Sequence, residues 1–382
     1  MNCEAINIPG KRLLGELESR IVEKRKQQKE LDAHYGSGRI RITSHMENIG
    51  WPELFGYDMN RYLEEPSFCF GQELRQKIFW MDNVDDDTIP DLGMPVGVGM
   101  YWDITLFGQQ IRHDAIGVPE FLPHPFQQKF DLDLLGRFDF HRTGDMTLLL
   151  RKYQKMKKLA ETEYEGKVRV CFPFFHRGPL DIYVQLRGYD NFIADVCERP
   201  DQLREALLFI ADERFRFAKE RQEYLGDKEL PASTFIGDDW VNIPFISPAI
   251  FRDFVVPAYE RIKTNEGPVT GFHTCGNIEP IVRELLEVLP EMSYLDVSPW
   301  NNVETLDRSV GSKIKFFAQI KNTVCLAGSE EEQRGLLEAI RGVGGHRDIE
   351  AHPQAIVKLQ PTYDETLDRL NGFMELAKGV LA

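Results

Sequence analysis

The sequence predicts an α/β fold, either a closed (β/α) barrel or a doubly wound parallel sheet. Strand-like and helix-like segments alternate throughout the second half of the chain, as expected of parallel strands joined by crossover helices. Polar clusters follow several predicted strands, where such folds present functional groups. The 382 residues exceed an ordinary single domain but suit one barrel of about 250 residues with additions.

Composition limits the classes of protein to consider. Hydrophobic residues make up 42% of the chain, enough for a large core. The net charge of −15 argues against a nucleic-acid partner, whose phosphates require a basic face. We see no signal peptide or long apolar span, so no membrane contact is expected. The six cysteines form no Cys-x-x-Cys pair, which indicates reduced thiols in the cytoplasm: Cys3, Cys69, Cys171, Cys197, Cys275 and Cys325.

The N-terminal region is predicted to be a helix followed by a first strand. Lys11–Glu30 is rich in Glu, Lys, Arg and Leu, so residues 1–38 are interpreted as a helical extension, either a solvated face or the arm of a homo-oligomer. Arg39-Ile-Arg-Ile-Thr43 alternates like a strand, and His45 and Glu47 follow at its mouth. Both are candidate substrate-binding residues, with capping or loop roles as the alternative.

Residues 39–382 are expected to form the main fold, with residues 82–130 inserted as a lid. The insertion contains an acidic run from Asp85, several Gly and Pro, and an aromatic-rich run. In that run Tyr101 and Trp102 are candidate walls for a flat substrate. The alternative is that these rings fill an irregular core.

The remaining elements are predicted from hydrophobic periodicity and from end signals. Helices are expected at Asp145–Tyr164, Pro200–Tyr224, Ala249–Lys263, Ile278–Leu289, Val303–Val310, Glu330–Arg341 and Thr362–Leu381. Strands are expected at Val168–Phe174, Ala232–Ile236, Tyr294–Val297 and Ile314–Ile320, with a last apolar run at Ala355–Leu359. His176 follows the first of these strands, and Asp238, Asp239 and Trp240 follow the second.

The segment Gly271-Phe-His-Thr-Cys-Gly-Asn277 reads as a buried strand that turns into a helix. His273 and Cys275 are two positions apart on extended backbone, so their side chains point the same way. A neutral imidazole and a thiolate suit zinc, and three protein ligands with one open position form a catalytic site. The alternative is a hydrogen-bonded His and a packed Cys at the end of the strand.

Three ordered motifs resemble the uroporphyrinogen decarboxylase superfamily, from roughly Arg39 to the C-terminus. The resemblance implies a TIM-type (β/α)8 barrel with its cleft at the C-terminal face of the strands. The motifs are Arg177-Gly-Pro-Leu-Asp181 with Leu186-Arg-Gly188, Ile246-Ser-Pro-Ala-Ile-Phe-Arg-Asp-Phe254 with Pro257, and Phe272-His-Thr-Cys-Gly-Asn277.

The superfamily contains two chemistries. Its decarboxylase uses an Arg-rich loop after the first strand to hold the many carboxylates of its substrate, whereas this chain has Ser44-His-Met-Glu-Asn-Ile-Gly50. A loop without guanidinium groups cannot form the paired bonds that carboxylates need, so porphyrin decarboxylation is not expected. The other branch is similar to zinc- and cobalamin-dependent methyltransferases. It implies methyl transfer from a small substrate, with the methyl ether of an aromatic favoured, to the cobalt of a corrinoid.

The resemblance also implies metal ligands and a partner. His273 and Cys275 match the His-x-Cys of the methyltransferases, and relatives often have Cys at the third ligand position. This chain offers His352 there, with Glu350 as the alternative. The cobalamin is expected on a separate corrinoid protein or free in solution.

Other residues are assigned to the chemistry around the metal. Some relatives that act on methyl ethers bind zinc through two carboxylates and a His, and Asp238-x14-Asp253-x19-His273 approximates that spacing; Asp253 is alternatively a carboxylate on a helix surface. Asp238 and Asp239 are expected to orient a ligand or donate a proton, and His176 is a further acid. The candidate substrate-binding residues are His45, Glu47, Tyr101, Trp102, Trp240 and Asn277.

Two rival interpretations remain. The first is a metal-free decarboxylase of a smaller acid, in which Arg177 or Arg187 holds a carboxylate and Asp238 or Asp239 handles a proton. The second is a binding module that kept the barrel without chemistry. Metal analysis of the purified protein separates the first rival from the methyltransferase.

Overall fold

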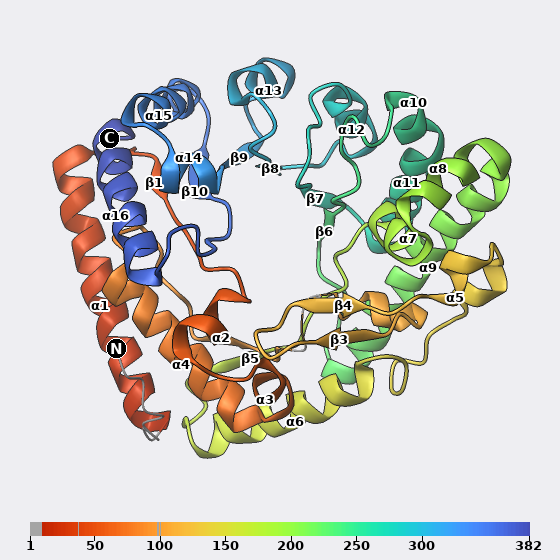
Figure 1. Ribbon diagram of the computed structural model, residues 1–382, viewed down its shortest axis with the longest axis horizontal. Helices are drawn as coiled ribbons and strands as arrows, with labels where there is room; N and C mark the ends of the chain where they lie inside the picture. The colour runs from red at the N-terminus through yellow and green to blue at the C-terminus, as the bar shows by residue number, and fades with distance from the viewer. Residues whose placement is uncertain (1–9, 37, 98, 100) are drawn as a thin grey trace.

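The computed structural model describes residues 10–36, 38–97, 99 and 101–382 (Figure 1). Its central sheet contains the strands β1 (Arg41–Ile42), β6 (Thr234–Gly237), β7 (Val269–His273), β8 (Tyr294–Val297), β9 (Lys315–Ile320) and β10 (Ile349–Pro353). These six strands are parallel and lie in the order β1-β10-β9-β8-β7-β6. Figure 1 shows them along an arc, with helices on its outer side.

Two more parallel strands, β2 (Gly93–Pro95) and β5 (Arg169–Cys171), pair with each other. The chain after β5 meets β6 at one bridge, where Gly178 N–H donates to Gly237 O at 2.7 Å and Gly237 N–H donates to His176 O at 3.0 Å. Among the described residues no strand pairing joins β1 to β2. The α/β class with parallel strands is confirmed, and closure into an eight-stranded barrel stays a prediction.

Helices cover the outer side of the sheet and extend below it in Figure 1. They are α1 (Gly10–Tyr35), α2 (Gly50–Phe55), α3 (Met59–Glu64), α4 (Pro66–Asn83), α5 (Pro125–Gln128), α6 (Met146–Thr162), α7 (Pro179–Arg187), α8 (Tyr189–Glu198), α9 (Pro200–Leu225), α10 (Pro248–Ile250), α11 (Val256–Glu266), α12 (Val282–Val288), α13 (Val303–Ser309), α14 (Asn322–Ala327), α15 (Glu330–Gly344) and α16 (Tyr363–Val380). Shorter elements are the 3₁₀ turns η1 (Ile104–Phe107) and η2 (Leu132–Leu135), the π-helix η3 (Phe251–Val255), and the antiparallel pair β3 (Ile111–His113) and β4 (Pro119–Phe121).

Most predicted elements are confirmed within a few residues, and β8 has the predicted bounds. The helix predicted from Ala249 is instead α10, η3 and α11 in succession. Pro257 has no N–H to bond the Asp253 carbonyl, which takes a hydrogen bond from Arg204 Nε at 3.1 Å, and the backbone widens to a π-helix there. The last apolar run, Ala355–Leu359, does not form the last strand. That strand is β10, which an apolar pattern does not reveal because the polar Glu350 lies within it.

The N-terminal helix and the acidic run pack against the main fold. Helix α1 contacts α4, and its buried apolar side chains are Leu13, Leu14, Leu17 and Ile21. In the acidic run Asp87 accepts hydrogen bonds from Arg39 at 2.6 and 2.7 Å, and Asp86 accepts from the Ser44 hydroxyl at 2.6 Å. These contacts join the acidic run to residues on either side of β1; the division of the chain into extension, lid and barrel stays a prediction.

Arg214 fills the opening between β5 and β6 below their bridge. It lies on α9 and is 2% exposed. Its guanidinium donates to His176 O at 2.8 Å, to Phe235 O at 2.7 Å and to the Glu266 carboxylate at 2.8 Å. A cavity of about 520 Å³ borders this opening. One side chain thus supplies hydrogen bonds that strand pairing supplies elsewhere in the sheet.

Within the described residues no helix has both the length and the apolar character that a bilayer-spanning segment needs. The five cysteines in that part of the chain are free, and Cys3 lies outside it.

Candidate functional site

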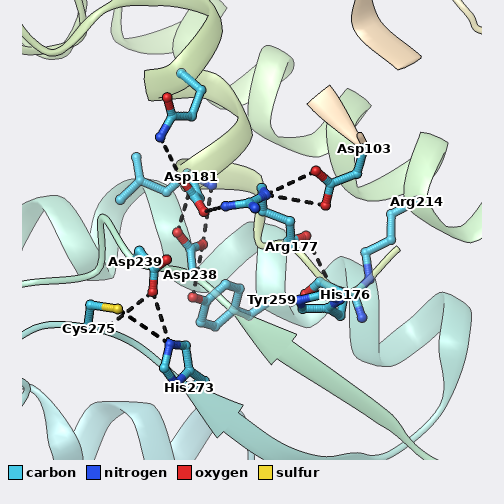
Figure 2. Close-up of polar contacts among 12 residues, drawn as sticks. Asp103, His176, Arg177, Asp181, Arg214, Asp238, Asp239, Tyr259, His273 and Cys275 are labelled. Atoms are coloured by element: carbon cyan, nitrogen blue, oxygen red, sulfur yellow. Dashed lines mark hydrogen bonds and ion pairs between the residues drawn. The ribbon is translucent and has the colours of Figure 1, made fainter. Parts of the chain in front are cut away.

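Asp239, His273 and Cys275 come together beyond the ends of β6 and β7 (Figure 2). Their nitrogen, sulfur and oxygen ligand atoms lie within 4.8 Å of one another. Strand register explains this: Gly237 is paired with His273, so the residue two beyond Gly237 lies level with Cys275. Asp239 Oδ1 accepts a hydrogen bond from Cys275 N at 3.1 Å, which fixes the carboxylate beside the thiol.

The separations within this cluster fit a tetrahedral metal site. His273 Nε2 is 3.5 Å from Cys275 Sγ and 3.3 Å from Asp239 Oδ1. Zinc bonds of about 2.3 Å to sulfur and about 2.0 to 2.1 Å to nitrogen and oxygen, at tetrahedral angles, hold N and S about 3.6 Å apart and N and O about 3.3 Å apart. These two separations, and the donor set of one carboxylate, one imidazole and one thiol, therefore suit this ion.

A second carboxylate orients His273 from the neighbouring strand. Asp296 on β8 lies with Oδ2 2.5 Å from His273 Nδ1, and its Oδ1 accepts from Gln319 Nε2 on β9 at 2.7 Å. With Nδ1 held in this way, Nε2 points at Cys275 and Asp239. Metal-bound histidines carry such a carboxylate on their other nitrogen, which sets the ring orientation and raises ligand basicity.

The cluster is strongly coupled electrostatically. Burial alone would lower the pKa of His273, but hydrogen bonds to Asp239, Asp296 and Cys275 raise it to about 12. Burial alone would raise the pKa of Asp239, but hydrogen bonds from His273 and Cys275 and the charge of Arg177 lower it to about 2. Burial raises the pKa of the Cys275 thiol. Without metal, the group is thus an imidazolium between carboxylates, beside a neutral thiol.

Close backbone packing shapes the loop that carries Cys275. A Cβ on Gly276 would lie 2.0 Å from Asn242 Cγ, so only glycine fits there. Asn277 is a predicted substrate-binding residue, but its N–H donates to Asn242 Oδ1 at 3.0 Å and its own Oδ1 accepts from Glu279 N at 2.9 Å. The structure gives Asn277 the role of holding the turn.

Asp238 is turned away from the cluster into the protein. It is fully buried, and it accepts hydrogen bonds from Asp181 N at 2.8 Å, Leu180 N at 3.3 Å and Tyr259 Oη at 3.1 Å. Burial raises its pKa well above the ordinary range. In this position Asp238 holds the first turn of α7 against β6, where backbone N–H groups need an acceptor. Its catalytic role stays a prediction.

Replacing Gly178 with alanine is expected to lower the free energy of unfolding by about 1–3 kcal/mol. An added Cβ would lie 2.1 Å from Asp238 Oδ2, and that carboxylate is fixed by α7. Urea denaturation measures the change. The control is Gly342→Ala, on the exposed face of α15 with no atom within 4 Å, which should be neutral or stabilising by up to about 1 kcal/mol. Equal stability of wild type and Gly178→Ala would contradict the packing described.

His352 lies outside the cluster, paired with His45. His352 Nε2 is 2.8 Å from His45 Nδ1, and its Nδ1 is 3.0 Å from Thr43 Oγ1. Both ring nitrogens are thus engaged within the protein. The prediction of His352 as third ligand is not supported by this geometry, and neither is Glu350, which accepts from the Thr43 hydroxyl at 2.7 Å. Asp239 takes the third place in the cluster.

A cavity of about 730 Å³ is bordered by Arg177 and Tyr101, and its lining does not include the three residues of the cluster. Arg177 relates the two, because its charge acts on Asp239. Arg177 binds Asp103 at 3.1 Å and Asp181 at 2.5 Å (Figure 2). Its guanidinium carbon lies 4.7 Å from the centre of the Tyr101 ring. Tyr101 has a φ of 66°, uncommon for a residue with a side chain, and burial raises its pKa. Trp102 also borders this cavity, so two of the three aromatic residues predicted to bind substrate lie beside it, and Trp240 does not.

The other predicted residues lie apart from the metal cluster. His176 is exposed and borders both this cavity and the one beside Arg214. Trp240 stacks on Tyr189 at 5.2 Å between ring centres. Glu47 accepts a hydrogen bond from Asn48 N at 3.0 Å. Asp253 is exposed on η3, which agrees with its alternative interpretation as a carboxylate on a helix surface.

Asp296 is the site residue that sequence reasoning missed. The strand Tyr294–Val297 was predicted, and a charged residue inside a short buried strand next to the His273 strand was the available signal. The sequence alone does not give the register that brings Asp296 to His273 Nδ1.

No family model and no curated protein matches the chain. Its structure is similar to that of a methyltransferase from Methanosarcina mazei, with a TM-score of 0.58 and 15% sequence identity over 88% of this chain and 94% of that chain. The likeness is one of fold. It places this chain among α/β proteins with the architecture of that methyltransferase.

Proposed function

We propose that this protein is a zinc-dependent methyltransferase that moves a methyl group from a small methylated substrate to the cobalt of a corrinoid. The observation that carries the proposal is the set of separations among Asp239, His273 and Cys275, which match the edges of a zinc tetrahedron. The fold shared with a methyltransferase supports the reaction class.

Asp239, His273 and Cys275 would hold the zinc, and Asp296 with Gln319 would keep His273 in orientation. When bound, zinc supplies a Lewis acid that stabilises the charge left on the substrate heteroatom as the methyl group departs. Arg177 lowers the pKa of Asp239, but its own charge is paired with Asp103 and Asp181. A neutral ether has a poor leaving group, so the charge of the zinc would matter most for a methyl ether.

The substrate would lie in the cavity of about 730 Å³ that Tyr101, Trp102 and Arg177 border. Flat aromatic surfaces next to a metal suit the methyl ether of an aromatic compound, because ring faces stack at offset geometry and exclude water. Within that class we expect small methoxylated aromatics as substrates.

The corrinoid would come from a partner protein or from solution. The hexapeptide Asp139-Phe-His-Arg-Thr-Gly144 does have the Asp-x-His-x-x-Gly spacing of a corrinoid-binding signature. In the structure it is a surface turn before α6, where the Asp139 carboxylate accepts from His141 N at 2.8 Å and Asp139 N donates to the Thr143 hydroxyl at 2.7 Å. These contacts account for the pattern as turn chemistry.

The metal-free decarboxylase requires an arginine that is free to bind a substrate carboxylate, and neither Arg187 nor Arg177 meets this requirement well. Arg187 is 5% exposed, with Asp195 at 2.7 Å and the carbonyls of Phe126 and Gln127 at 3.0 and 2.9 Å. It has no exposed face for a substrate carboxylate. Arg177 borders the cavity but is already neutralised by two carboxylates.

Metal analysis combined with a methyl-transfer assay tests the proposal. Purified protein should contain one zinc per chain and should methylate cob(I)alamin from at least one member of a panel of methoxylated aromatics, methylamines and methyl thiols. The assay follows the change in the corrinoid spectrum. A metal-free protein that decarboxylates a small acid would overturn the proposal in favour of the rival.

Replacing Asp296 with asparagine is expected to weaken zinc binding by about 10–100-fold. The substitution keeps an oxygen near His273 Nδ1 but removes the charge that orients the ring and raises its basicity. Competition with a chromophoric chelator measures the affinity. Asp364→Asn, on the exposed first turn of α16, is the matched control and should bind zinc like wild type. Unchanged affinity in Asp296→Asn would mean that this carboxylate does not support the site.

A further inference from the structure

Four side chains form a hydrogen-bond chain between the segment after β1 and strand β10. Glu350 Oε1 is 2.7 Å from Thr43 Oγ1, Thr43 Oγ1 is 3.0 Å from His352 Nδ1, and His352 Nε2 is 2.8 Å from His45 Nδ1. Backbone bonds of Ile356 with His45 O at 2.8 Å and with Glu47 N at 2.9 Å keep the two segments aligned. The metal cluster does not use any of these side chains.

The donors and acceptors available determine which group donates in each hydrogen bond of this series. A carboxylate only accepts, so the single proton of the Thr43 hydroxyl goes to Glu350. The Thr43 oxygen must then accept from His352 Nδ1–H. A neutral His352 has its lone pair on Nε2, so His45 Nδ1–H donates there. The chain therefore leaves His45 with Nε2 as its free nitrogen.

His352, in the middle of the hydrogen-bond chain, is buried, whereas His45, at its end, is exposed. His352 is 7% exposed and its ring centre lies 4.5 Å from that of Phe317; burial, with the charge of His45, lowers its pKa to about 3. His45 is exposed, and no described residue forms a hydrogen bond with its Nε2. Burial lowers the pKa of His45, and the charges of Glu47 from its own segment and Asp296 from β8 act against that shift. His352 from β10 is its hydrogen-bond partner.

Asp296 connects this chain with the metal cluster. Its Oδ2 binds His273 Nδ1 at 2.5 Å, and its charge also acts on the His45 imidazole. His352 is paired in register with Gln319 on β9, and Gln319 Nε2 donates to Asp296 Oδ1 at 2.7 Å, so the segment after β1 and the cluster lie at the same end of the parallel sheet. His45 follows β1, and the strands β10, β9 and β8 lie between β1 and the His273 strand.

We propose that His45 Nε2 transfers the proton at the substrate heteroatom, and that His352, Thr43 and Glu350 are positioning residues that aim this nitrogen. The inference rests on the proposed methyl transfer and assigns its proton donor. When the bond to the methyl carbon breaks, the heteroatom keeps that electron pair and takes the proton from protonated His45 Nε2. Neutral His45 is then reprotonated from solvent. In the reverse direction His45 takes the proton from the heteroatom.

The first test is the tautomeric state of the histidines in the full chain, metal-free and zinc-loaded. Nitrogen NMR with ¹⁵N-labelled histidine, at a pH where the imidazoles are neutral, should show the proton on Nδ1 in both His45 and His352. Assignments come from His45→Gln and His352→Gln. Thr43→Val should shift His352 away from the Nδ1–H form, and Thr43→Ser should restore it. His45 with its proton on Nε2 would overturn the inference.

The second test is kinetic. His45→Gln should lower kcat for demethylation by about 100-fold or more, with KM and zinc content unchanged, because a positioned acid contributes that much. His34→Gln, an exposed histidine on α1, is the control and should behave like wild type. A His45→Gln variant with wild-type kcat overturns this inference while methyl transfer by wild type upholds the proposed function. Failure of wild type to transfer methyl groups overturns both.

Discussion

Replacing Cys275 with serine should remove stoichiometric zinc and methyl transfer together. The thiolate supplies one of the three ligand atoms, 3.5 Å from His273 Nε2, and a serine hydroxyl remains protonated and binds zinc poorly. Mutating a residue that only hydrogen-bonds to a metal ligand typically lowers metal affinity by about 10–100-fold. Loss of a ligand itself should have a larger effect, so we expect zinc affinity to fall by more than about 100-fold. Elemental analysis after dialysis and the corrinoid methylation assay measure both effects.

Cys197→Ser is the matched control for that experiment. Cys197 is exposed near the end of α8 and shares no contact with the cluster, so zinc content and activity should equal those of wild type. Full zinc retention in Cys275→Ser, with His273 intact, would show that the metal is held elsewhere. Methyl transfer by a zinc-free variant would show that zinc does not act as a Lewis acid in the reaction.

Replacing Arg214 with methionine is expected to lower the free energy of unfolding by about 3–5 kcal/mol. The substitution preserves most of the apolar stem but removes the guanidinium. The Glu266 carboxylate then loses its buried charge partner and keeps only the Thr234 hydroxyl, and the carbonyls of His176 and Phe235 lose the hydrogen bonds that the guanidinium donates. Because unpaired buried polar groups cost more than the original bonds contributed, the loss should exceed that of a surface ion pair. Denaturant unfolding of the full chain measures it.

Arg334→Met provides the comparison for an exposed arginine. Arg334 lies on α15 and pairs with Glu330 at 2.8 Å near the surface, where such pairs contribute about 0–1 kcal/mol. A double variant, Arg214→Met with Glu266→Gln, should recover part of the loss by removing the unpaired carboxylate. If Arg214→Met were no more harmful than Arg334→Met, the opening between β5 and β6 would have to be supported by other contacts.

The grouping of His273 with Cys275 could be predicted from the sequence. These residues are two positions apart, and extended backbone places such residues on one side, although β7 ends at His273 and Cys275 lies just beyond it. Asp239 was recognised as a candidate, but its place as third group depends on the pairing of Gly237 with His273, which hydrophobic periodicity does not encode. Asp296 required the same kind of information for β8.

The third ligand was predicted at His352 because of its position near the last strand. His352 does lie on the last strand of the chain, because β10 contains it. Its side chain is nevertheless engaged by His45 and Thr43, and side-chain pairing between β1 and β10 links residues about 300 positions apart. Likewise Asp238 and Asp239 are adjacent in sequence, and alternation sends one into the protein and the other to the cluster.

Incomplete pairing between β5 and β6 leaves backbone groups that could pair with another molecule. Strand edges of this kind are templates for aggregation, and proteins usually protect them with charge or cover. Here the protection is the Arg214 guanidinium, which occupies carbonyls on both sides. The solubility of this protein during storage and heating should therefore depend on an arginine that has no part in its chemistry.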